Sequence, residues 1–361
     1  MRNLVFCSDG TSNTARDRTN VYQVYSMLEE TPSQIKAYDR GVGTRFGNVL
    51  RGCAFGVGLH LNILDGFRFL SKNYREGDRI YLFGYSRGAY TVRSLASMIC
   101  LCGLAHGDFD ETTIRSFWKA YCANRRPEEF RKRMAGVEAR EAPVEAVCVW
   151  DTVGSIGRQT RTEDIRKKLA HRYHRMTVHR NIRRIYHAVS IDERRTQFFP
   201  HLLFGQVESP CTIAEEVWFP GVHSDIGGCY RDEDPSLGEV TLSWMISKVA
   251  EELEFREGAV ESLRPDPLGR MHNREGGLIF SFFRKRNRPV RRGSVLHRSV
   301  VERIASPPKS YHQHREPSGN YCPLALNFCS FSDPPEFGIP RNYTIENDQF
   351  ASGGNENEDQ A

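Results

Sequence analysis

No apolar run in this 361-residue chain approaches the roughly 20 residues that a membrane-spanning helix needs. The N-terminal residues MRNLVFCSD enter a strand-like pattern at once, and they lack the long apolar stretch and small-residue cleavage site of a secretory signal. We therefore expect a cytoplasmic protein, although export by a dedicated secretion system would require neither feature. Hydrophobic residues make up 39% of the chain, which is enough to build a sizeable α/β core.

Metal-ligand spacing is also missing from the cysteines. The chain has 10 of them, scattered along its length, and pairs such as Cys100 and Cys102 do not have the spacing of a zinc site. Cys7, Cys100 and Cys148 fall in apolar runs typical of a protein interior. We therefore expect reduced thiols without a disulfide framework.

The chain has no internal repeat, and it alternates instead between strand-like and helix-like segments. This alternation predicts an α/β-hydrolase-like fold with a mostly parallel central sheet flanked by helices. The expected strands are residues 4–7, 35–38, 79–83, 144–150, 185–191 and 216–219, and the expected helices are 20–28, 60–74, 88–101, 111–124 and 240–253. The expected organisation is a hydrolase domain over 1–305 with a basic helical insertion at about 155–184, a loop-rich segment packed on it over 306–350, and a disordered acidic tail over 351–361.

Positive charge is unevenly distributed along the chain. The formal net charge is only +5, but residues 158–184 hold 10 Lys or Arg, and residues 284–292 form a second basic cluster. Such clusters can dock on anionic membrane or on nucleic acid. The alternative interpretation is a solvated helical face followed by a basic loop.

The strongest chemical signal is the pattern Gly-x-Ser-x-Gly at residues 84–88. It follows an apolar run and precedes a helix-like pattern, which is the context of a nucleophile elbow rather than of a structural turn. Ser86 would sit on the strained strand-to-helix turn, and the two glycines would let strand and helix approach closely. The Arg87 backbone N–H and the helix dipole would then stabilise a developing oxyanion.

Two other expected strand ends carry the partners that a serine nucleophile needs. The order Ser86, Asp151, His223 is that of nucleophile, acid and histidine in α/β-hydrolases. His223 would remove the serine proton while Asp151 orients the imidazole, so neither a metal nor another cofactor is expected. Alternatives stay open: Asp151 as a helix cap, His223 as a core histidine, and Asp225 as a second orienting carboxylate or a structural cap. His187 and His297 are weaker histidine candidates, and His187 is expected instead to pack on a helix.

The segment Asp9-Gly10-Thr11 invites a rival interpretation. Haloacid-dehalogenase phosphatases carry Asp-x-Asp-Gly-Thr after their first strand, with the first Asp as the nucleophile, but here that position is Cys7. Gly10 and Thr11 instead make sense as backbone donors of the oxyanion hole, with Asp9 bracing their loop. The glycine-rich stretch 41–58 lacks the Lys-Ser/Thr of a phosphate-binding loop, so we interpret it as a rim of the active site.

Several segments together resemble one family, the α/β-hydrolase domain family of uncharacterised proteins that includes type VI secretion phospholipase effectors. The matching segments are SDGTSN (8–13), TNV (19–21), GVGT (41–44), GDRIYLFGYSRGA (77–89), VWDTVG (149–154), HAVSIDERR (187–195) and WFPGVHSDIGG (218–228). They follow the family's order over residues 1–305. The sequence departs from the effectors at Ser8, where Phe is common, and at Ser12, where Trp is common. We also expect their long membrane-engaging extension to be absent here.

The resemblance implies a catalytic triad of Ser86, Asp151 and His223 that hydrolyses phospholipid carboxylesters at the sn-1 or sn-2 position. It also implies a bracing ion-pair network that contains Asp192, Glu193 and Arg194. The leading hypothesis is thus a phospholipase A-like serine hydrolase that works through an acyl-enzyme on a lipid or other acyl ester. The alternatives are an esterase or thioesterase for soluble acyl substrates, and a non-catalytic module that binds anionic membrane or nucleic acid. Nucleic acid is the least favoured partner, and the oligomeric state stays open.

Overall fold

A single parallel sheet organises the part of the chain that the computed structural model describes. Those residues are 1–10, 13, 17–41, 59–123, 138–154, 176–208, 212–230, 236–272, 285–291, 293–306, 321, 323–326 and 344–346. Within them, eight strands pair in the order β10-β9-β8-β7-β6-β3-β1-β2, and every neighbouring pair is parallel. The predicted α/β fold with a mostly parallel sheet is confirmed.

The strands in the middle of the sheet are short, mostly apolar runs because helices cover both faces of the sheet. In chain order they are β1 (Asn3–Ser8), β2 (Gln34–Asp39), β3 (Arg79–Tyr85), β6 (Val144–Trp150), β7 (Ile182–Ser190), β8 (Ile213–Phe219), β9 (Val295–His297) and β10 (Thr344–Glu346). Two further strands, β4 (Leu104–His106) and β5 (Glu138–Arg140), form a separate antiparallel pair.

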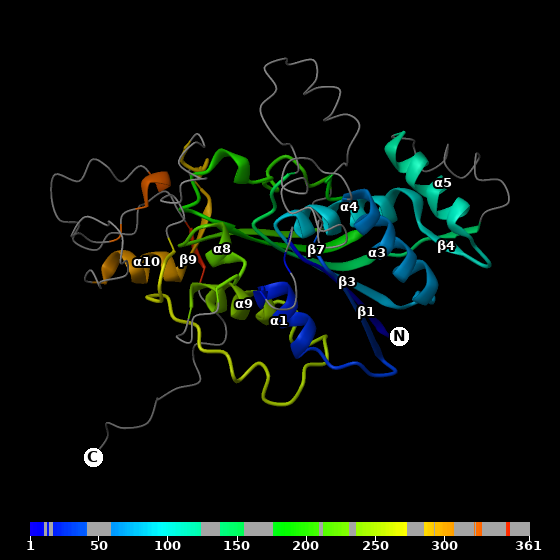
Figure 1. Cartoon of the computed structure of the whole chain (residues 1–361), viewed down its shortest axis with the longest axis horizontal. Helices are drawn as coiled ribbons and strands as arrows, with labels where there is room; N and C mark the ends of the chain where they lie inside the picture. Colours follow the sequence, from blue (N-terminus) through cyan, green and yellow to red (C-terminus); the bar gives the residue numbers. More distant parts are fainter. Residues whose placement is uncertain are drawn as a thin grey trace.

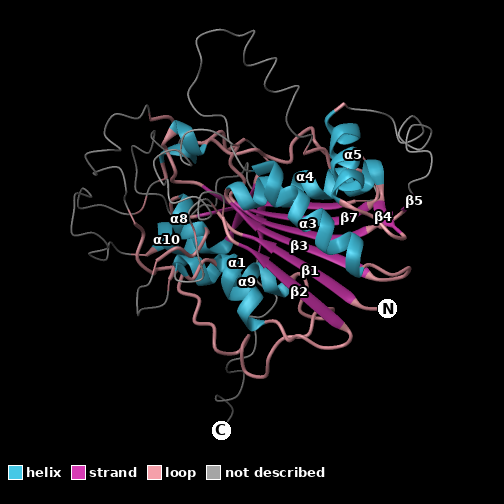
Figure 2. Cartoon of the chain, turned by 45° about the vertical axis from the view of Figure 1, so that its right-hand side comes forward, coloured by secondary structure: helices cyan, strands magenta, loops and turns pink. Residues whose placement is uncertain are grey.

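Helices lie in two layers, one on each face of the sheet (Figures 1 and 2). Successive side chains of β1 point to opposite faces of the sheet: Phe6 packs with the first helix layer, and Val5 packs with the second. The first layer is α3 (Leu59–Asn73), α4 (Arg87–Cys102) and α5 (Glu111–Cys122), and the second is α1 (Asn20–Met27) and α9 (Leu237–Ser247). At the β9 side, α10 (Arg298–Ala305) packs through Val300 against Trp218 and Leu296. Among the described helices, none is both long and apolar enough to cross a bilayer.

The structure differs from the elements predicted from the sequence in several places. β7 begins at Ile182, three residues before its predicted start, so Arg183 and Arg184 belong to the sheet and pair with Glu145. The sequence did not predict β4, β5, β9, β10 or α10, because three-residue strands and an eight-residue helix leave little periodic signal. Most of the predicted basic insertion and all of the predicted tail lie outside the described residues.

Glycine packing joins α4 to the end of β1. A Cβ atom on Gly88 would lie 2.0 Å from the carbonyl oxygen of Ser8, and one on Gly84 would lie 2.6 Å from the carbonyl oxygen of Gly88. Both contacts are with backbone, which cannot rotate away as a side chain can. The two glycines of the motif are therefore required by the close approach of strand, helix and neighbouring loop.

Replacing Gly88 by Ala is expected to lower the free energy of unfolding by about 3 kcal/mol, at the upper end of overpacking costs. The reason is that α4 must move away from the loop after β1. Urea unfolding would measure the loss. Gly77→Ala is the matched control, because Gly77 has a φ of +86° but nothing within 4 Å of its added Cβ; it should cost only about 1 kcal/mol of backbone strain. An unchanged midpoint for Gly88→Ala would contradict the packing described here.

Candidate active site

Ser86 occupies a strained turn between β3 and α4. Its φ is +58° and its ψ is −118°, a combination that residues with a side chain rarely adopt. The Ser86 N–H donates to the carbonyl oxygen of Trp150 at 3.0 Å, and the Ser86 carbonyl oxygen accepts from the N–H of Tyr90 at 3.2 Å. These bonds hold the serine between the end of β6 and the first turn of α4, on a strand-to-helix turn of the kind that the motif predicts.

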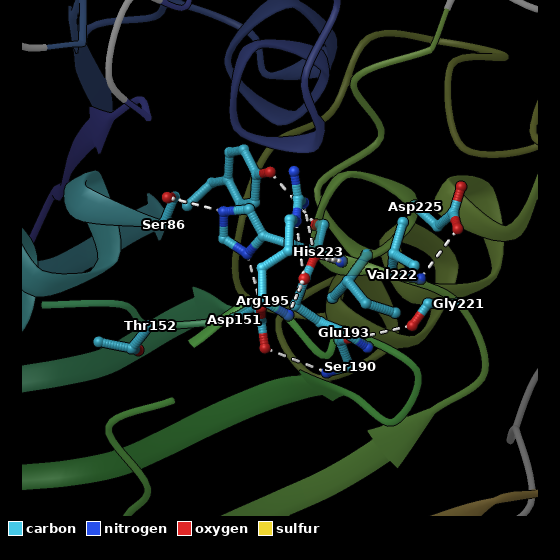
Figure 3. Close-up of polar contacts among 12 residues, drawn as sticks. Ser86, Asp151, Thr152, Ser190, Glu193, Arg195, Gly221, Val222, His223 and Asp225 are labelled. Atoms are coloured by element: carbon cyan, nitrogen blue, oxygen red, sulfur yellow. Dashed lines mark hydrogen bonds and ion pairs between the residues drawn. The ribbon is translucent and has the colours of Figure 1, made fainter. Parts of the chain in front are cut away.

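The structure brings Ser86, His223 and Asp151 into one chain of contacts (Figure 3). The Ser86 Oγ lies 2.8 Å from His223 Nε2, and His223 Nδ1 lies 2.5 Å from Asp151 Oδ2. Ser86 follows β3, Asp151 follows β6, and His223 begins the short helix α8 (His223–Ile226) after β8. Parallel strands end at the same edge of a sheet, so residues distant in sequence meet there. All three side chains are buried, with exposed fractions of 6% for Ser86, 3% for His223 and 0% for Asp151.

Two aromatic rings hold the imidazole of His223. The Tyr85 ring stacks on it with 4.9 Å between centroids, and the Phe198 ring lies 4.7 Å away. The Tyr85 hydroxyl also donates to the His223 carbonyl oxygen at 3.2 Å, and the His223 N–H donates to Glu193 Oε2 at 3.3 Å. Ring and backbone are thus both fixed. The sequence singled out neither aromatic residue, because an aromatic side chain beside a strand end is ordinary core composition.

Arg288 is the main site residue that sequence reasoning missed. Its guanidinium donates to both carboxylate oxygens of Asp151, each at 2.9 Å, and its Nε donates to the Glu193 carbonyl oxygen at 3.2 Å. The Ser190 N–H donates to Asp151 Oδ1 at 3.1 Å. The sequence placed Arg288 in a basic surface cluster, which is wrong for this residue, because its side chain is buried. Nothing in a run of lysines and arginines marks the one member that faces inward.

Asp151 is kept ionised by its partners. Burial alone would raise the pKa of this carboxyl, but the charge of Arg288 and the hydrogen bond from His223 outweigh burial and lower the pKa below its ordinary value. A carboxylate that stays charged at neutral pH accepts the Nδ1 proton of His223 and leaves Nε2 to face the serine. The site therefore combines a buried, ionised carboxylate with a histidine and a serine in hydrogen-bond reach of one another.

The residues before His223 brace its loop. Glu193, one of the predicted bracing residues, forms an ion pair with Arg195, at 2.6 Å between Arg195 Nη2 and Glu193 Oε2. Asp192 accepts hydrogen bonds from the Gly221 N–H and the Tyr321 hydroxyl, both at 2.7 Å, and burial raises its pKa to about 6. These contacts connect the end of β7 to the loop that carries the histidine.

Asp225 braces the same loop from the other side. It accepts from the Val222 N–H at 2.9 Å and lies 2.7 Å from His272 Nδ1. Of the two roles that the sequence left open for Asp225, these contacts fit the structural cap. The carboxylate in contact with His223 Nδ1 belongs to Asp151 instead.

Asp9 is hydrogen-bonded to groups on three segments around the end of β1. Its carboxylate accepts from the hydroxyls of Thr19 and Tyr38, both at 2.6 Å, and from the Gly10 N–H at 2.7 Å. The Gly10 N–H, a predicted oxyanion donor, is therefore bonded to Asp9 in this structure. Thr11 lies outside the described residues, as does most of the glycine-rich stretch.

The weaker candidate His187 lies in β7, the strand next to the one that ends at Asp151, and outside the chain of contacts from Ser86 through His223 to Asp151. Its Nδ1 is 2.9 Å from Glu216 Oε2, and its Nε2 accepts from the Thr152 N–H at 3.1 Å. Thr152 directly follows Asp151, so this second histidine–carboxylate pair fixes the backbone that presents the acid. His187 is fully buried, and both of its ring nitrogens are engaged by Glu216 and Thr152.

Comparison with known proteins identifies the family. Residues 2–248 match the profile of the type VI secretion phospholipase effector Tle1-like catalytic domain. The chain belongs to this family. Membership supports an ester hydrolase of the phospholipase or lipase type.

Three similar proteins each match this chain over only part of their own length. The uncharacterised protein YEL023C of Saccharomyces cerevisiae is 28% identical over 230 residues, which cover 55% of this chain and 32% of that protein. An uncharacterised protein from Pseudomonas aeruginosa has a crystal structure that matches 73% of this chain and 48% of its own, at 17% identity and a TM-score of 0.45. The Tle1 effector bound to the VgrG spike matches over 66% of this chain and 52% of its own, at 17% identity and a TM-score of 0.38. The chain thus spans about a third to a half of these proteins.

Proposed function

We propose that this Tle1-like domain is a serine hydrolase that cleaves the acyl esters of phospholipids, in the manner of a phospholipase A. The observation that carries the proposal is the continuous chain of contacts from Ser86 Oγ through the His223 ring to Asp151. Family membership supplies the class of substrate. The strained φ of Ser86 supports it independently, because such strain is retained where a side chain must be presented for chemistry.

The proposed reaction uses side chains and backbone of this chain together with one water molecule. As Ser86 Oγ attacks the ester carbonyl, its proton passes to His223 Nε2, and Asp151 stabilises the imidazolium through Nδ1. The imidazolium then gives the proton to the departing alcohol, the lysophospholipid, and leaves an acyl group on the serine. A water molecule, deprotonated by the same histidine, hydrolyses the acyl-enzyme and releases a fatty acid.

The oxyanion is proposed to lie at the start of α4. The Arg87 N–H follows the nucleophile directly and stands at the positive end of a 16-residue helix. Gly10 and Thr11 remain the proposed source of a second donor. For Gly10 to serve, its N–H must exchange the Asp9 carboxylate for the oxyanion.

Ser86→Ala is expected to abolish labelling by a fluorophosphonate probe and to lower lipid hydrolysis at least about 10³-fold, because the nucleophile is lost. Mass spectrometry of the labelled peptide and of fatty acid released from phospholipid vesicles would measure both effects. Ser94→Ala is the matched control, since Ser94 is a buried serine on the same helix. It should label like the wild type.

Each outcome of this experiment has a definite meaning. A folded wild-type protein that takes no label would overturn the serine-hydrolase proposal. Labelling with hydrolysis of short p-nitrophenyl esters, but without fatty acid release from phospholipid, would reject the phospholipid substrate and identify a soluble-substrate esterase.

A further inference from the structure

Exposed apolar side chains gather on the segment that follows Phe198. Within the described residues, six large hydrophobic side chains are exposed, and three of them lie between positions 199 and 207: Phe199, Phe204 and Val207. Phe204 is 69% exposed and Phe199 is 41% exposed. Burying a phenylalanine releases substantial free energy, so two exposed phenylalanines on one short segment indicate a surface that another apolar phase covers.

Cations from a different part of the chain border these rings. The Arg291 guanidinium lies 4.0 Å from the centroid of the Phe204 ring, and the Arg286 guanidinium lies 5.8 Å from that of Phe199. The Arg286 N–H also donates to the carbonyl oxygen of Arg194, which fixes this segment beside the one that carries the phenylalanines. Arg286 and Arg291 are both exposed. The surface therefore combines apolar rings with positive charge.

This surface is physically continuous with the catalytic site. Phe198, next to Phe199, packs on the His223 ring, and Pro200 forms a bridge to Val153, two residues beyond Asp151. On the cationic side, Arg288 lies between Arg286 and Arg291 in sequence and points inward to Asp151. One segment thus places Phe198 in the site and Phe199 on the surface. The other places Arg288 in the site and Arg286 and Arg291 on the surface.

We propose that Phe199, Phe204, Arg286 and Arg291 form a docking surface, the aromatic–arginine surface, for an anionic phospholipid bilayer. Aromatic rings partition into the interfacial region of a bilayer, and arginines pair with its phosphates, so both halves of the surface match one partner. Docking would bring the active site to its substrate. The inference rests on the proposed lipid-hydrolase function and names the surface through which that site meets lipid.

The test measures binding of the Ser86→Ala protein, which leaves the lipid intact, to sedimented vesicles of phosphatidylglycerol and phosphatidylcholine. Adding Phe199→Ser with Phe204→Ser is expected to weaken binding about 10-fold or more. Adding Arg286→Gln with Arg291→Gln is expected to weaken it about 25-fold on anionic vesicles and to remove most of its salt dependence. Pure phosphatidylcholine should bind weakly in every case.

Two variants outside the surface serve as controls. Leu61→Ser removes an apolar side chain of similar exposure on α3, and Arg183→Gln removes an exposed arginine on β7. Both should bind vesicles like the parent protein. Urea midpoints would show that each variant is folded. If the double phenylalanine variant does not fold, vesicle binding by the double arginine variant tests the docking surface alone.

The outcomes separate this inference from the proposed function. Unchanged vesicle binding by the folded arginine pair or the folded phenylalanine pair overturns the docking surface. Binding lost equally with the two control variants also overturns it. If the Ser86→Ala protein binds through this surface but the wild-type protein releases no fatty acid from phospholipid, the docking surface is supported and the proposed function is rejected. In the otherwise wild-type protein, the surface variants should hydrolyse a dissolved short-chain phospholipid at an unchanged rate, and a loss there would assign the residues to catalysis instead.

Discussion

Asp151→Asn is expected to lower kcat about 10⁴-fold on a short-chain ester, because an amide cannot fix the imidazole tautomer or balance its charge as a carboxylate does. In this chain the effect is reinforced by Arg288, which donates to both oxygens of the native carboxylate. An asparagine placed there would turn its oxygen toward the guanidinium and its NH2 toward His223 Nδ1. The histidine would then carry its proton on Nε2 and could not accept one from Ser86. Initial-rate kinetics with a p-nitrophenyl ester would measure the loss.

Asp225→Asn is the control for this prediction. Asp225 was the rival acid in the sequence, and it contacts His272 and the Val222 N–H rather than His223 Nδ1. Its replacement should change kcat less than about 10-fold and act mainly on stability. If Asp225→Asn proves as inactive as Asp151→Asn, the assignment of the acid to Asp151 fails.

Arg288→Met is expected to lower the free energy of unfolding at pH 7 by about 3–5 kcal/mol, the usual cost of removing one partner from a buried ion pair. Methionine fills much of the same volume, so the loss reports the uncompensated charge of Asp151 more than a cavity. Denaturant unfolding would measure it. Arg286→Met, two residues earlier on the exposed surface, should stay within about 0.5 kcal/mol of the wild type.

The dependence on pH identifies the cause of this destabilisation. The pKa of Asp151 is lowered in the folded protein from an ordinary value of 3.8, so the stabilisation from its partners is fully present above that pH and is lost as pH falls further. The difference between wild type and Arg288→Met should therefore be largest at neutral pH and shrink below about pH 4. A difference that stays constant from pH 7 to pH 3 would mean that the arginine acts through packing, not charge.

The local pattern of the chain was enough to predict most of the fold. β6 was predicted with its observed limits, Val144–Trp150, because a strand buried on both faces must be a continuous apolar run. The elbow at Ser86 was predictable for a similar reason: glycines on both sides are needed where strand, helix and loop backbones touch. The short β9 and β10 were not predictable, since their pairing depends on partners far away in the chain.

The sequence by itself determined the order of the longer strands and helices, the strained serine turn, and the order in which Ser86, Asp151 and His223 follow the strands. Each of these is encoded in neighbouring residues, through apolar periodicity or glycine spacing. Only the tertiary structure decided that Arg288, 137 positions from Asp151, is buried against it while Arg286 and Arg291 stay outside beside exposed rings. The physical reason is that a buried charge is stabilised by whichever partner the fold brings near, and arginines in one basic run look alike until the fold buries one of them.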